Sequence, residues 1–321
     1  MSSLEHERPA GRPDTEQEFR SEPGIDRIAP STAGRPGPEP FSFRHGDFEV
    51  RVFSDGFITL PAEIVLPDIP PPSRPGILER LGGTPGAAPF HVNIPLIRCG
   101  PDLILVDNGS GDKFQASAGR LEQNLIAAGV DPLAITKVVF THVHPDHAGG
   151  TIRPDGRLLC PNADYVVSEA EYRFWTDPDY ERTMPSGLHA FARGSQRDLS
   201  AMGDRLTLVR PGDDVVPGMR VLATPGHTPG HVSYELAGGD GLIINGDVAT
   251  SNLVFFEHPD WHFGFDTDRE AALETRRRFL DRVAAEKVTM LGYHWPYPGV
   301  GIAERRGLAY RFVALRGDAD V

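Results

Sequence analysis

Hydrophobic and polar positions alternate where the ordered part of the chain begins, near residue 41. Residues 48–53 read Phe-Glu-Val-Arg-Val-Phe, and the alternation resumes at 57–60 after Ser54-Asp55-Gly56. A period of two predicts half-buried strands, and the Ser-Asp-Gly sequence predicts a turn between them. Residues 61–89 follow with eight prolines. We expect this segment to be mostly irregular and to serve as a lid or an interface element.

The next pair of strands is predicted at 92–97 and 103–106, on either side of a Gly-Pro pair. From residue 117 onward helical and strand periods alternate. We expect helices at 117–129, 169–176, 186–203 and 269–285, and strands at 137–141, 165–168, 219–223, 231–236, 242–245 and 288–291. The side chains of residues 266–268 can cap the last helix. This pattern, without a linker after residue 41, predicts one layered α/β domain over residues 41–321.

Residues 1–40 have a different composition from the rest of the chain. They hold seven prolines and thirteen charged residues, with only isolated apolar positions. Such a segment buries too little apolar surface to offset the entropy of ordering it. We therefore expect a disordered N-terminal tail.

Composition excludes several classes of protein. The 321 residues include 45 acidic and 32 basic side chains, a net charge of −13, which disfavours a non-specific nucleic-acid binder. No apolar run approaches the length of a membrane span, and the N-terminus lacks the apolar core of a secretory signal. Two cysteines, Cys99 and Cys160, are too few for a disulfide scaffold. We expect a cytoplasmic globular protein.

Candidate chemistry is concentrated in residues 141–150, Thr-His-Val-His-Pro-Asp-His-Ala-Gly-Gly, directly after a predicted strand. His142 and His144 are two residues apart, so on an extended backbone they point the same way. Asp146 and His147 follow a proline that favours a turn, so they can face a second position. Imidazole and carboxylate together suit zinc and similar divalent metals.

Three further ligand-type residues follow predicted strands. His227 lies in a Pro/Gly-rich turn after 219–223, Asp247 follows 242–245, and His294 follows 288–291. Strand ends are where α/β sheets usually build their sites.

This order of motifs, His-x-His-x-Asp-His followed by His227, Asp247 and His294, resembles the metallo-β-lactamase superfamily from about residue 43 to 315. Residues 103–109, 263–268 and 292–299 are similar to the branch that contains methyl parathion hydrolases and N-acyl-homoserine lactonases. The resemblance implies an αββα sandwich, two mixed sheets with helices outside.

The resemblance also implies a ligand set. His142, His144 and His227 would hold one zinc ion, and Asp146, His147 and His294 the other, with Asp247 bridging. Asp107 is similar to an aspartate that orients ligands in the family, whereas His231 matches no required ligand. Dinuclear β-lactamases commonly use a cysteine where this chain has Asp247, so antibiotic hydrolysis is not expected as the main role.

Two metal ions about 3.5–4 Å apart can share a hydroxide that attacks a carbonyl carbon or a phosphorus. We therefore predict a zinc-dependent hydrolase of a lactone, ester or phosphotriester, with Asp146 as a proton shuttle. Lactonases of the family often have a tyrosine at the position of Thr250. Phe114, Trp175 and Phe191 resemble the aromatic pocket wall of the organophosphate-hydrolysing branch, with ordinary core packing as the alternative.

Other functions remain open at this stage. A nuclease of the same superfamily would bring basic elements that a chain of charge −13 lacks. A mononuclear iron dioxygenase of persulfides would bind one iron rather than two zinc ions. A non-catalytic binding module is disfavoured because every expected metal-ligand position is filled. The expected partner is a small-molecule substrate, with no nucleic acid and no membrane, and a homodimer is left open.

Overall fold

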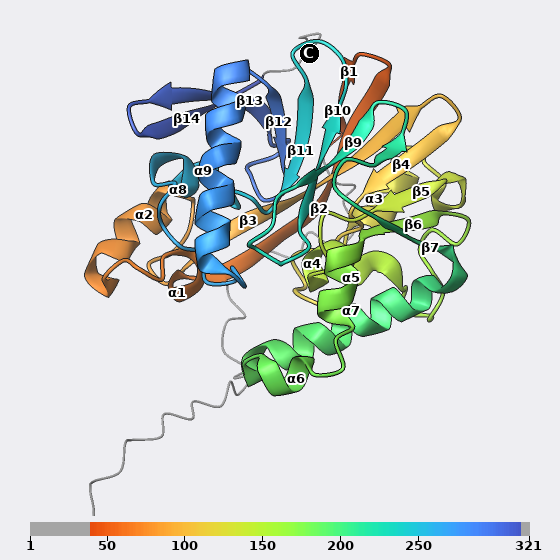
Figure 1. Ribbon diagram of the computed structural model, residues 1–321, viewed down its shortest axis with the longest axis horizontal. Coiled ribbons are helices and arrows are strands. Elements are labelled where there is room, and N and C mark those ends of the chain that lie inside the picture. The colour runs from red at the N-terminus through yellow and green to blue at the C-terminus, as the bar shows by residue number, and fades with distance from the viewer. Residues whose placement is uncertain (1–38, 316–321) are drawn as a thin grey trace, which may run out of the picture. The chain divides into compact units, whose positions relative to one another are not determined.

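Two mixed β-sheets of seven strands each lie at the centre of the computed structural model, which describes residues 39–315 (Figure 1). The first sheet has the strand order β1-β2-β3-β4-β5-β6-β7, and the second has the order β14-β13-β12-β11-β10-β9-β8. The strands of the first sheet are β1 Phe41–His45, β2 Phe48–Pro61, β3 Ala87–Cys99, β4 Asp102–Val106, β5 Lys137–Val139, β6 Asp164–Ser168 and β7 Leu206–Val209. Those of the second are β8 Asp214–Val216, β9 Met219–Ala223, β10 Val232–Leu236, β11 Leu242–Gly246, β12 Thr289–Gly292, β13 Val300–Arg306 and β14 Ala309–Ala314.

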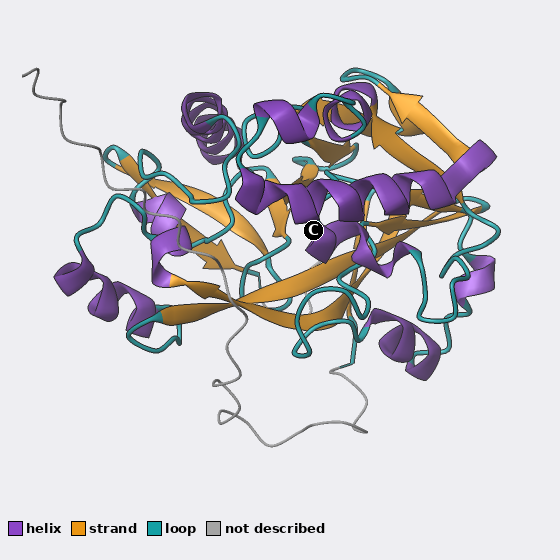
Figure 2. Ribbon diagram, turned by 90° about the horizontal axis from the view of Figure 1, so that it is seen from below, coloured by secondary structure: helices purple, strands orange, loops and turns teal. Residues whose placement is uncertain are grey.

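Helices lie outside the two sheets, as the view from below shows (Figure 2). They are α1 Ala62–Val65, α2 Arg74–Arg80, α3 Leu121–Ala127, α4 Pro145–Ala148, α5 Glu169–Trp175, α6 Tyr180–Thr183, α7 His189–Met202, α8 Val254–Glu257 and α9 Arg269–Glu286. α3 and α5 pack on the first sheet, and α8 and α9 pack on the second. The αββα sandwich predicted from the sequence is confirmed.

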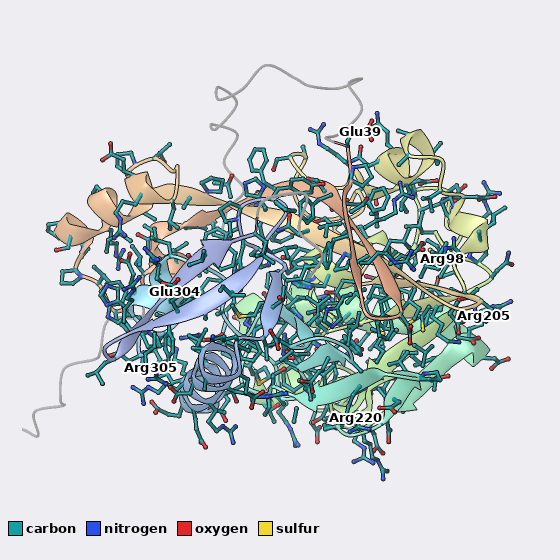
Figure 3. All side chains as sticks on the ribbon, turned by 90° about the horizontal axis from the view of Figure 1, so that it is seen from above. Glu39, Arg98, Arg205, Arg220, Glu304 and Arg305 are labelled. Carbon is teal, nitrogen blue, oxygen red and sulfur yellow. The ribbon has the colours of Figure 1, made fainter. Side chains whose placement is uncertain are left out.

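Apolar side chains fill the space between the sheets. Val52, Ile104 and Val139 of the first sheet meet Val221 and Ile244 of the second in one buried cluster. A larger cluster joins the outer faces of the sheets to the helices. Charged side chains such as Arg98, Arg205 and Arg220 lie at the periphery instead (Figure 3). The central strands are therefore buried on both faces, as in β11, where all five residues are buried.

The predicted turn at Ser54-Asp55-Gly56 is wrong. β2 continues through these residues with a shift of register against β3 between Ser54 and Gly56, which is a β-bulge. The Asp55 carboxylate is fully buried and accepts hydrogen bonds from the backbone N–H groups of Ser110, Gly119 and Leu121, at 2.9, 2.9 and 2.7 Å. A turn-forming sequence is thus used to anchor the loop that follows β4.

The prediction that residues 61–89 are mostly irregular is also wrong in part. This segment contains α1, a 3-10 turn at Pro71–Ser73 and α2, and β3 begins at Ala87. The prolines do not prevent these helices because they stand in first turns, as Pro75 does in α2. A first-turn N–H has no partner within its helix, so proline loses nothing there. The other elements that were not predicted include the edge strands β7, β8 and β14, the seven-residue strand β13 between β12 and β14, and the short helices α4, α6 and α8.

Several predicted elements are confirmed. β9 has the predicted bounds, and α9 begins one residue after Asp268, whose side chain accepts a hydrogen bond from the N–H of Ala271 at 3.0 Å. The predicted tail, residues 1–40, lies outside the described residues except for Glu39 and Pro40. No helix within residues 39–315 is long and apolar enough to cross a membrane.

Candidate metal centre

The ligand-type side chains follow the ends of strands from both sheets. β4 and β5 are parallel, as are β11 and β12, so each pair ends at one edge of its sheet. The motif 142–147 follows β5, Asp247 follows β11 and His294 follows β12. Pro145 is the first residue of α4, and this one-turn helix directs Asp146 and His147 away from the extended segment that carries His142 and His144.

One group of imidazoles is formed by His142, His144 and His227, all of them buried. The Nδ1 atom of His144 lies 2.9 Å from Nε2 of His142 and 3.0 Å from Nε2 of His227. Three ring nitrogens therefore converge on one point, although 83 residues separate His144 from His227 in the chain.

The second group is formed by Asp146, His147 and His294. Asp146 Oδ2 lies 3.3 Å from His294 Nε2 and 3.8 Å from His147 Nε2. Asp247 lies between the two groups: its Oδ2 is 3.3 Å from His227 Nε2 and 3.4 Å from His294 Nε2, and its Oδ1 is 3.4 Å from His147 Nε2. All seven residues singled out in the sequence are thus brought together.

The outward nitrogens of three of these imidazoles are held by oxygen acceptors. His147 Nδ1 lies 2.9 Å from Asp107 Oδ2, His227 Nδ1 lies 3.0 Å from Asp266 Oδ1, and His294 Nδ1 lies 2.8 Å from the carbonyl oxygen of His91. An N–H at Nδ1 leaves the lone pair of Nε2 directed into the site. Each ring is therefore fixed in the orientation and tautomer that a metal ligand needs.

Asp107 adopts a backbone conformation that is rare for residues other than glycine, with φ of 60°. Its carboxylate accepts hydrogen bonds from the N–H of Thr141 at 2.8 Å and from the Thr141 hydroxyl at 2.9 Å, besides its contact with His147. These bonds connect the end of β4 with the residue before His142, and they offset the backbone strain at Asp107.

His231, which matched no ligand position, supports Asp247 instead. Its Nδ1 lies 3.0 Å from the carbonyl oxygen of Thr224, and its Nε2 accepts a hydrogen bond from the N–H of Asp247 at 2.9 Å. Burial lowers the pKa of His231 to about 3. A neutral imidazole is what this arrangement requires, because Nε2 must be free of a proton to accept.

The inward atoms fit a metal site. His147 Nε2 and Asp247 Oδ1 are buried and make no hydrogen bond with any residue that the structure describes. Burial and the neighbouring imidazoles hold the pKa values of His142 and His144 well below the usual range, so both rings are neutral and can donate lone pairs. The ligand-type groups found in residues 39–315 include neither Cys99 nor Cys160.

Glu171 is a residue of the site that sequence reasoning missed. It lies on α5 and is fully buried, and its Oε1 accepts hydrogen bonds from the N–H of Val143 at 2.9 Å and from Nε1 of Trp175 at 2.6 Å. Its Oε2 accepts from the Thr228 hydroxyl at 2.6 Å. Val143 stands between His142 and His144, and Thr228 is next to His227. One carboxylate therefore joins both chain segments that supply the first group.

Asp266 and Arg276 were also missed as site residues. Arg276 is buried, and its Nη2 donates to Asp266 Oδ2 at 3.1 Å while Nε donates to the carbonyl oxygen of Val248 at 3.0 Å. It thus connects the acceptor of His227 with the residue after Asp247. The helical spacing is the local signal that could have identified Arg276, because it lies three residues after Leu273 and three before Phe279, on the buried face of α9.

The mouth of the site is apolar. Ile58, Leu60, Phe114, Phe191, Phe263 and Phe265 line it together with Pro145 and the ligand-type residues. Trp175 is not among these lining residues: it is 1% exposed and its ring lies behind His144, with 5.4 Å between centroids. Of the three aromatic residues considered from the sequence, Phe114 and Phe191 line the pocket and Trp175 packs in the core.

Comparison with known families settles the classification. Residues 87–294 match the metallo-beta-lactamase superfamily. The chain belongs to this superfamily. It is similar to an N-acyl homoserine lactonase of a Bacillus species, with 29% identity over 175 residues, which cover 52% of this chain and 59% of the relative. The match therefore spans about three-fifths of the length of that curated relative.

Solved structures of metallo-beta-lactamase superfamily proteins have the same fold. AidC, described as a dizinc quorum-quenching lactonase, superposes with a TM-score of 0.80 at 26% identity, over 87% of this chain and 98% of AidC. The hydrolase AbOPH superposes with a TM-score of 0.80 at 28% identity, over 89% of this chain and 100% of AbOPH. The predicted superfamily is thus confirmed.

Proposed function

We propose that this chain is a dinuclear metal-dependent hydrolase of a lactone, an ester or a phosphotriester. The observation that carries the proposal is the position of Asp247 between the two ligand-type groups. Its two oxygens lie 3.3–3.4 Å from His227, His147 and His294. A carboxylate that faces both groups at equal range is suited to bridge two divalent ions.

The residues of each group divide the ligand roles between them. His142, His144 and His227 would hold one ion, and Asp146, His147 and His294 the other. Imidazole and carboxylate donors without a thiolate suit Zn²⁺, so we propose zinc at both positions. When bound, two such ions supply an activated water at neutral pH and polarise a carbonyl or phosphoryl oxygen.

Asp146 is the residue best placed to move a proton. Its side chain is 11% exposed and lines the pocket, whereas that of Asp247 is 4% exposed. Burial raises the pKa of Asp146, but without metal the positive charge on His147 and His294 outweighs burial and lowers this pKa, and a bound divalent ion would favour the carboxylate in the same way. The carboxylate is therefore ionised at neutral pH, accepts a proton from the attacking water and passes it to the leaving alkoxide.

The pocket wall supports a neutral substrate with an apolar portion. Apart from the proposed ligands, its lining residues are Ile58, Leu60, proline and phenylalanines, with no charged side chain. The relatives named as lactonases act on such a substrate class. Thr250 is buried and stands where family lactonases often have a tyrosine. Because the chain lacks that tyrosine, the substrate panel must include esters and phosphotriesters besides lactones.

The test combines elemental analysis with a substrate panel. We expect two zinc ions per chain and hydrolysis of N-acyl homoserine lactones or aryl esters, with weaker hydrolysis of phosphotriesters. Activity should vanish on chelation and return when zinc is added back. A chain that binds one iron and oxidises glutathione persulfide, or one that cleaves RNA and none of the panel, contradicts the proposal.

A further inference from the structure

Two cavities meet at Phe114. One is the pocket of the candidate metal centre, which encloses about 20 Å³. That volume holds about one water molecule, whereas pockets for small-molecule ligands usually measure ~300–1,000 Å³. The space beside the ligand residues can therefore receive the reacting group of a substrate, and the remainder of the substrate must lie elsewhere.

The second cavity lies along the loop after β4 and encloses about 490 Å³. Phe114 lines this cavity as well as the pocket. Its other walls include apolar side chains of Ala118, Leu121, Ile152 and Leu159, polar side chains of Asp112 and Gln115, and the ion pair of Glu122 and Arg153. Phe114 is thus common to a small reactive space and a larger one that offers apolar surface as well as polar groups.

The backbone that carries Phe114 is held on both sides. Asp55 accepts hydrogen bonds from the N–H groups of Ser110, Gly119 and Leu121. The Lys113 ammonium donates to the carbonyl oxygens of Gly149 and Ile152. The Phe114 ring itself is only half-buried, and it touches Phe191 edge-on with 6.4 Å between centroids. The loop is thus fixed by these bonds, and Phe114 is a side chain of this loop that lines both cavities.

We propose that the second cavity binds the acyl chain of the substrate and that Phe114 turns aside to admit it. This inference rests on the proposed hydrolase function and names its substrate class: esters or lactones with a medium to long unbranched acyl chain. If the acyl chain of the substrate ran outward past Phe191 and Phe265 instead, its methylene groups would stay in water. The inward course buries them, which improves binding about fourfold for each methylene.

The experiment compares kcat/KM for dodecanoyl and butanoyl substrates, either homoserine lactones or p-nitrophenyl esters. Ala116→Trp places an indole in the second cavity from an exposed lining position, and Ile152→Trp does so from a lining position 36 residues further along the chain. Ala134→Trp is the matched control, because Ala134 is also exposed and lines a separate cavity of about 500 Å³ on the first sheet. Thermal unfolding and metal content are measured for every variant.

We expect the dodecanoyl-to-butanoyl ratio to fall at least tenfold in either blocking variant and to stay unchanged in Ala134→Trp. Tenfold corresponds to the lost burial of about two methylenes. An unchanged ratio in both blocking variants, with wild-type folding and metal content, overturns the acyl-chain cavity and leaves the hydrolase function standing. Failure of the wild type to hydrolyse either substrate, or any lactone, ester or phosphotriester, overturns both proposals.

Discussion

Glu171 provides the sharpest test of how the candidate metal centre is assembled. Its carboxylate is the common acceptor for Val143, Trp175 and Thr228, so Glu171→Ala leaves three buried donors without a partner. Each unsatisfied donor costs ~1–3 kcal/mol. Allowing for local relaxation, we expect Glu171→Ala to lower the free energy of unfolding by about 4 kcal/mol.

Glu171→Gln should behave differently because the amide retains an oxygen for Val143 and Trp175. Its NH₂ group then faces the Thr228 hydroxyl, which can accept a hydrogen bond. Burial raises the pKa of Glu171, so replacing the carboxylate by a neutral group removes a desolvation cost. We expect Glu171→Gln to remain within about 1 kcal/mol of the wild type in stability.

The zinc affinity of the variants distinguishes a positioning role of Glu171 from a merely structural one. The first group should lose affinity in Glu171→Ala by about 10–100-fold, whereas the group of Asp146, His147 and His294 should change little. Calorimetric titration of zinc into the metal-free protein resolves the two sites. Leu236→Ala is the control, since Leu236 is fully buried between the sheets and its truncation costs ~2–5 kcal/mol without touching the site. Wild-type zinc affinity at both sites of Glu171→Ala would refute the positioning role. A loss of zinc affinity in Leu236→Ala as large as that in Glu171→Ala would also refute it.

The other predictions concern the proposed bridging carboxylate Asp247, the pocket wall and the buried acid Asp55. Asp247→Ala should bind fewer than two metal ions by elemental analysis, and Cys160→Ala should retain both; two ions in the Asp247 variant would rule out the bridge. Trp175→Ala should destabilise the protein by ~3–5 kcal/mol and weaken metal binding. Phe191→Ala should instead raise KM while the metal content stays full. A raised KM at full metal content in Trp175→Ala would place Trp175 in the pocket wall. Burial raises the pKa of Asp55 to about 6 from 3.8, so its protonated form favours folding below pH 4 and this stability is lost as pH rises to 6. Denaturant unfolding should show the wild type losing about 3 kcal/mol relative to Asp55→Asn over this window, and parallel curves would contradict the assignment.

The sequence predicted the parts of the site that depend on local pattern. The 142–147 motif contains four ligand-type residues in six positions, and His227, Asp247 and His294 each follow a recognisable strand. The topology then brings the strand ends together. Local chemistry identified the 142–147 motif, whereas the grouping of His227, Asp247 and His294 with it came from the resemblance to the metallo-β-lactamase superfamily.

What the sequence did not predict depends on contacts between distant segments. Glu171 and Thr228 are 57 residues apart, and nothing near Glu171 shows that its carboxylate is buried. Asp55 was interpreted as a turn residue because Asp-Gly favours turns, yet its partners lie 55 to 66 residues further along the chain. Trp175 has the residue type of a pocket wall, and only the packing places it behind His144.

The first seven strands of the chain form one sheet and the last seven form the other, and this division has a consequence for assembly. The exposed link at 210–213 separates β1–β7 from β8–β14, and each ligand-type group draws two residues from the first half and one from the second. A chain cleaved in this link would yield two fragments, neither of which contains a complete group. Binding at the proposed metal centre would therefore require association of the two halves, and zinc titration of the mixed fragments, compared with each fragment alone, would report that association.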